Sequence, residues 1–221
     1  MATKTYFSQY IDDIDRVITE AIHKHDMASI ALANARTRNK KAQANRDYSY
    51  DKKAVEAARF REAEADYKKE VVSIQDDMEA SFKALRLSLV KHIAEYTAAD
   101  PGKVDQSAVM LLNSGSMRDT DLVALANKYW NNPTMLKLVA GAAEKDMTDS
   151  KTARVLALKI AEYISPDTRL RVFDSAVDAA KRTVNHSEGY SAAFQKLWAG
   201  EAYNALKAGM SRLDTFSMEV M

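Results

Sequence analysis

Residues 60–96 read FREAEADYKKEVVSIQDDMEASFKALRLSLVKHIAEY, and this stretch decides the fold. Its apolar side chains recur with a mean step of about 3.6 residues, the period of a straight α-helix. A helix that begins near Ser49 would have about 50 residues and would be too long for one small globule. The apolar stripe along it needs a cover, so we predict self-association through these side chains: Phe60, Tyr67, Val71, Ile74, Met78, Phe82, Leu85 and Leu89.

A second stripe of the same period precedes it and runs from Phe7 to Leu32. We expect a first helix from about Thr5 to the mid-thirties. All glycines and prolines lie after residue 100, which favours helix through the whole preceding stretch. A turn within residues 44–50, where Asn, Asp and Ser gather, would pair the two helices as an antiparallel hairpin. The alternative is one uninterrupted rod.

The second half has a different pattern, which begins where Pro101-Gly102 ends the long helix. Short apolar-periodic segments are separated there by recognisable helix caps. We expect short helices over residues 105–113, 119–130, 133–144, 150–164, 166–185 and 187–218. The sequence therefore predicts an all-α fold, with a long N-terminal amphipathic helical hairpin or rod in residues 1–100 and a compact bundle of short helices in residues 101–221.

The composition excludes several classes of site and partner. The absence of cysteine removes disulfides, thiolate metal sites and cysteine nucleophiles. With 32 basic and 31 acidic side chains the net charge is +1, so a polyanion could be bound only by a local cluster. The longest uncharged run falls well short of the roughly 20 residues that span a bilayer, and the start lacks the apolar block of a signal peptide. We expect a cytosolic protein that does not span a membrane.

The residues offer little catalytic chemistry. No closely spaced glycines follow a strand, and no serine is flanked by glycines at the spacing of a hydrolase elbow. Glu20 and His23 have the spacing of one half of a di-iron site, but the second half is missing. We expect no catalytic residues, no cofactor and no metal, and therefore a protein that is not an enzyme.

One local cluster of positive charge stands out in this neutral chain. It consists of Arg36, Arg38, Lys40, Lys41 and Arg46, with no acidic residue among them. Such a cluster could be a solvated tip, could bind an acidic protein surface, or could neutralise nucleic-acid phosphates. In the last case Tyr48 and Tyr50 could stack on exposed bases.

The C-terminal tail ends in large apolar side chains. Phe216, Met218 and Met221 have little chain left to cover them, which is typical of a partner-binding surface. The alternative is that this last segment folds back onto the bundle.

Part of the second half resembles a known group of proteins. The segments Leu111–Gly115, Asp121–Val123 and Asn127–Leu136 are similar to a stretch found in small helical proteins from structural modules of tailed phages and prophages of Gram-positive bacteria. The resemblance covers about 30 residues and implies a role in virion assembly or as a virion component. Capsid scaffolds often have a strongly acidic body and a basic C-terminal tail, and this chain has neither.

These observations lead to two functional hypotheses. The first is a non-enzymatic structural or assembly protein that binds other protein subunits or copies of itself through its helices, as a phage virion component or morphogenesis factor. It would work in the host cytoplasm during assembly and in the virion. The alternative is a nucleic-acid-binding module that uses the basic segment 36–46.

Overall fold

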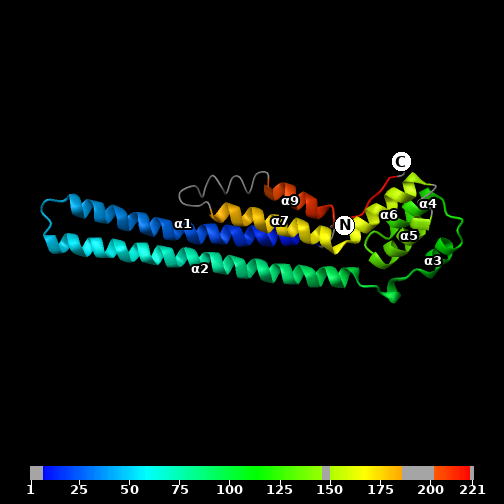
Figure 1. Cartoon of the computed structure of the whole chain (residues 1–221), viewed down its shortest axis with the longest axis horizontal. Coiled ribbons are helices and arrows are strands. Elements are labelled where there is room, and N and C mark those ends of the chain that lie inside the picture. The colour runs from blue at the N-terminus through cyan, green and yellow to red at the C-terminus, as the bar shows by residue number, and fades with distance from the viewer. Residues whose placement is uncertain (1–6, 146–149, 186–201, 220–221) are drawn as a thin grey trace. The chain divides into compact units, whose positions relative to one another are not determined.

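A computed structural model of the chain describes residues 7–145, 150–185 and 202–219 (Figure 1). Within these ranges all regular structure is helical and there is no strand, so the predicted all-α fold is confirmed. The elements are α1 (Gln9–Ala44), α2 (Tyr50–Thr97), the 3₁₀ turn η1 (Pro101–Lys103), α3 (Gln106–Asn113), α4 (Asp119–Lys128), α5 (Pro133–Lys145), α6 (Lys151–Ile164), α7 (Pro166–Asn185) and α9 (Tyr203–Ser211).

Residues 45–49 turn the chain between α1 and α2. The Asn45 side-chain oxygen accepts a hydrogen bond from the backbone N–H of Asp47 at 2.8 Å. The Ser49 hydroxyl accepts one from the backbone N–H of Lys52 at 3.3 Å and so caps the start of α2. Short polar side chains at these positions replace backbone partners that a continuing helix would supply. The predicted turn is confirmed, and the uninterrupted rod is wrong.

The first helix is longer than the sequence predicted. It continues to Ala44 rather than ending in the mid-thirties. Alanines replace the large side chains of the apolar stripe there, and this change in the pattern predicts an earlier end of the helix. Alanine is the strongest helix former, so a stretch that cannot build a large core still continues as helix.

The short helices of the second half follow their caps closely. The Asp105 carboxylate accepts hydrogen bonds from the backbone N–H groups of Ser107 and Ala108 at 3.0 and 3.2 Å, and the Ser150 hydroxyl accepts one from Ala153 at 3.1 Å. Gly115, with φ of 66°, follows α3 in a conformation that favours glycine. The bounds of α3 to α7 therefore lie within about two residues of prediction.

The last predicted helix is only partly tested. Of residues 187–218, those up to 201 lie outside the described ranges. Within the remainder α9 ends at Ser211, and residues 215–219 follow without regular structure. The prediction of a helix as far as Met218 is therefore wrong at its C-terminal end.

Contacts divide the chain into two compact units. The bundle unit comprises Met1–Asp12, Leu85–Ala176 and Ala202–Met221, and the hairpin unit comprises Asp13–Ala84 and Val177–Glu201. This division differs from the predicted boundary at residue 100, because α1, α2 and α7 each contribute residues to both units.

In the hairpin unit α1 and α2 lie side by side and antiparallel (Figure 1). Buried apolar side chains line both helices: Ile14, Ile18 and Ile22 on α1, and Ile74, Met78 and Phe82 on α2. Each large side chain removed from water stabilises the folded state by roughly 1.5–3 kcal/mol. A polar contact joins the same two helices, because the Tyr67 hydroxyl lies 3.0 Å from Nε2 of the buried His25.

The bundle unit has its own apolar core. Leu136 and Val139 of α5 pack in one cluster with Leu156 and Ile160 of α6, all fully buried. Helix α4 adds residues to the same cluster. This core is large enough to hold several short helices that could not be stable alone.

A buried arginine organises the rest of the bundle unit. Arg169, at 0% exposure, donates hydrogen bonds to the backbone carbonyls of Tyr163 and, at 2.9 Å, Leu213. Its guanidinium carbon lies 4.4 Å from the centre of the Phe7 ring and 5.4 Å from that of Tyr96. Burial lowers the pKa of the guanidinium, and the field of nearby tyrosines and of Asp214 opposes that shift. One side chain therefore joins four segments that are distant in sequence.

The neighbouring Asp214 is also buried. Its carboxylate oxygens accept hydrogen bonds from the backbone N–H groups of Phe7 at 2.6 Å and Ser8 at 3.1 Å. These bonds fasten the residues just before α1 to the segment after α9. A charged acceptor makes such bonds stronger than those between neutral groups.

We predict that Arg169→Ala lowers the free energy of unfolding by about 3 kcal/mol, because it leaves buried carbonyls without donors and opens a cavity. Urea unfolding followed by circular dichroism measures this. The matched control is Arg171→Ala on the exposed side of the same helix, which should change the stability by less than about 0.5 kcal/mol. Equal effects of the two substitutions would contradict the role given to Arg169.

Candidate interaction surfaces

The apolar stripe of α2 is largely covered within the chain. Of the predicted self-association residues, Ile74, Met78, Phe82 and Leu89 are buried, and Phe60, Tyr67, Val71 and Leu85 are half-buried. In the hairpin unit α1 supplies the cover. The premise that this stripe needs a second copy is therefore not met, and the reason is the turn at residues 45–49, which brings the chain's own first stripe against it.

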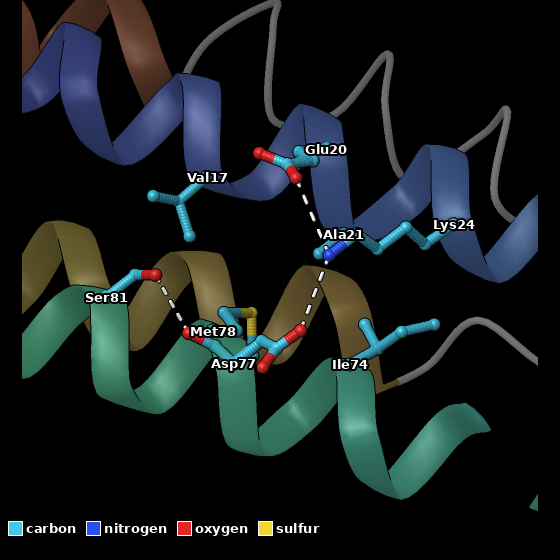
Figure 2. Close-up of a pocket in the computed structure, with 8 residues that line it drawn as sticks. All are labelled: Val17, Glu20, Ala21, Lys24, Ile74, Asp77, Met78 and Ser81. Atoms are coloured by element: carbon cyan, nitrogen blue, oxygen red, sulfur yellow. Dashed lines mark hydrogen bonds and ion pairs between the residues drawn. The ribbon is translucent and has the colours of Figure 1, made fainter. Parts of the chain in front are cut away.

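A small pocket lies between α1 and α2 in the hairpin unit (Figure 2). Lys24 reaches across its mouth, with Nζ 3.5 Å from a Glu20 oxygen and 3.4 Å from an Asp77 oxygen. The hydrogen bond with Asp77 raises the pKa of Lys24. The volume, about 60 Å³, leaves room for a few water molecules and for no larger ligand. We interpret this site as a polar clamp between the two helices.

The basic residues predicted as phosphate or partner contacts gather where the hairpin turns. We call residues 33–55 the hairpin end. It contains seven basic residues and two acidic ones. The five predicted contacts, Arg36, Arg38, Lys40, Lys41 and Arg46, are all exposed. Among the residues that the structure describes, none of the seven cations forms an ion pair.

The hairpin end is held by hydrogen bonds and small side chains instead of a large core. The Gln43 amide donates to the backbone carbonyl of Lys53 at 3.0 Å and so connects α1 to α2. Ala42 is buried beside it. Lys52 lies over the Tyr48 ring at 3.7 Å, whereas Tyr50 is 86% exposed. The cations are thus displayed on an ordered pair of helices.

The C-terminal tail is folded back in the bundle unit. Phe216 and Met218 are buried in its apolar core, and the Asn127 side chain exchanges two hydrogen bonds with the backbone of Met218, at 2.7 and 2.9 Å. The Phe216 ring packs edge-on against Tyr163 at 5.4 Å. These two residues therefore do not form an exposed partner surface, and the third candidate, Met221, lies outside the described residues.

A surface that the sequence did not single out lies on α3. Met110 and Leu111 are 67% and 53% exposed, next to the bundle core. The sequence segment 105–113 is apolar on nearly all sides, and contacts with the rest of the bundle unit, among them those with α5, decide which side is buried. A pattern of this kind predicts the helix but does not predict its exposed face.

Two further observations concern the described ranges alone. No group of three His, Asp or Glu side chains is placed to hold a metal ion among those residues. None of the described helices combines the length and the apolar composition needed to cross a membrane.

Comparison of the chain with protein-family models, with curated proteins and with solved structures gave no match in any of the three.

We predict that Ile74→Ala lowers the free energy of unfolding by about 2–4 kcal/mol, because Ile74 is 3% exposed and its loss leaves a cavity between α1 and α2. The mass in solution, measured by light scattering, should stay that of the unchanged protein. The matched control is Val72→Ala on the same helix, where the side chain is 55% exposed and little stability should be lost. A fall in mass with unchanged stability would show that the stripe joins separate copies.

Proposed function

We propose that this protein is a non-enzymatic structural or assembly component that binds a larger partner through its hairpin end. The observation that carries the proposal is the set of seven basic side chains at the hairpin end, none ion-paired within the described residues. In a chain of net charge +1 this is a local excess that an anionic partner would compensate.

The construction of the hairpin supports this proposal. The apolar stripe of α2 is largely buried against α1, so little of it is left to bind another copy of the chain. The inner side chains of the hairpin end are mostly alanines, so this segment offers a partner no large apolar surface. Its exposed side chains offer positive charge instead. Electrostatic attraction of this kind increases the rate of association and selects partners by charge.

The class of assembly is suggested by the resemblance of residues 111–136 to phage structural proteins. Under that proposal the protein is a virion component or a morphogenesis factor, and its other partners are protein subunits. Copies of this chain that associate would do so through surfaces other than the α2 stripe, such as the one that contains the exposed Met110 and Leu111.

The proposal predicts how the protein sediments in a lysate of the cells that make it, prepared without nuclease. The unchanged protein should sediment faster than the purified chain, in a complex with its partner. The variant Arg36→Ala/Arg38→Ala/Lys41→Ala should sediment as the free chain, because its hairpin end has lost three of its seven cations.

The control variant is Arg61→Ala/Lys68→Ala/Lys69→Ala. It removes the same charge from exposed α2 positions that form no ion pair among the described residues. It should sediment like the unchanged protein. Sedimentation of the unchanged chain as free protein, or equal loss in both variants, would refute the proposal.

A further inference from the structure

Four cations of the hairpin end lie on two sides of one helix. Successive residues of an α-helix are about 100° apart, so Arg36 and Lys40 share one flank of α1 while Arg38 and Lys41 share the other. The face toward α2 is marked by Ala42, which is buried.

Small side chains fill the space between the two flanks. Ala33, Thr37 and Ala44 fall on one line along the helix, on the side opposite Ala42, and all three are exposed. The Thr37 hydroxyl donates to the backbone carbonyl of Ala33 at 2.9 Å, so it lies close to the helix surface. The last three turns of α1 therefore present a low floor of small side chains between two rows of positive charge.

This arrangement indicates what kind of anion it would fit. A flat acidic surface could meet one flank at a time, and the other would stay unpaired. A channel with negative charge on both walls, wide enough for a helix of about 10–12 Å, would meet both. The major groove of duplex DNA is about 12 Å wide and has a phosphate backbone along each wall.

We propose that the last three turns of α1 insert into the major groove of duplex DNA, with Arg36 and Lys40 on one phosphate backbone and Arg38 and Lys41 on the other. The inference rests on the proposed function and names its partner class. Alanine and threonine offer no bidentate contact to a base edge, so the binding is independent of base sequence. Duplex RNA is excluded, because its major groove is too narrow for a helix.

The test is fluorescence anisotropy of the full chain with a labelled DNA duplex of about 20 base pairs at several salt concentrations near 50–200 mM. A plot of log affinity against log salt should have a slope of about −4, from four neutralised phosphates. The variant Arg36→Ala/Arg38→Ala/Lys41→Ala should bind at least about tenfold more weakly and with a slope closer to −1. The variant Arg61→Ala/Lys68→Ala/Lys69→Ala should bind like the unchanged chain.

A second pair of variants tests insertion separately from charge. Thr37→Glu places a carboxylate on the floor between the cations and should weaken binding at least about tenfold. Thr19→Glu adds the same charge at another exposed position of α1 and should have little effect. Melting curves by circular dichroism establish that each variant is folded.

Three results would overturn the inference. They are absence of binding at about 50 mM salt, equally tight binding of duplex RNA, and tighter binding of polyglutamate than of DNA. The last result would assign the hairpin end to an acidic protein. In each case the proposed assembly function would stand if the sedimentation result holds, because that experiment detects an anionic partner of any class.

Discussion

The hairpin unit depends on the burial of two apolar stripes against each other. Neither α1 nor α2 could keep its stripe in water as a single helix, and isolated helices gain little stability from propensity alone. The turn at residues 45–49 brings the two stripes together within one chain, and the isoleucines of α1 then lie along Ile74, Met78 and Phe82. The His25–Tyr67 contact adds a polar pair at one position, which disfavours a shift of one helix along the other.

The same constraint explains where charge can collect. Large apolar side chains end near Leu32 on α1, and beyond it the inner face of that helix carries Ala35, Asn39 and Ala42. Small inner side chains contribute little hydrophobic stability, so the hairpin end relies on the Ser49 cap and the bond from Gln43 to Lys53. The rest of its surface is free to carry cations. Charge and apolar burial thus occupy separate parts of the hairpin unit.

Local sequence patterns predicted most of the secondary structure. They could not predict contacts between residues that are far apart in the chain. The caps at Asp105 and Ser150 and the period of residues 60–96 are readable because each depends on residues a few positions apart. The burial of Phe216 and Met218 depends on Asn127 and Tyr163, far away in the chain. The sequence pattern did not indicate that Arg169 is buried, since an arginine on a helix is usually exposed to solvent. The basic cluster was predicted, but the division of its cations between two flanks follows from the face that α2 covers.

The hairpin end combines weak internal packing with uncompensated charge, and these two features act on its stability in the same direction. Mutual repulsion among Arg36, Lys40, Arg38 and Lys41 opposes the close approach of their helix turns, and few buried side chains counter it. A partner with negative charge on both sides would remove that repulsion, so the bound form of the hairpin end would be more stable than the free form. A larger apolar core there would hold the turns without a ligand. Under the proposed function, the alanines on the inner face would therefore make the order of this segment responsive to a bound partner.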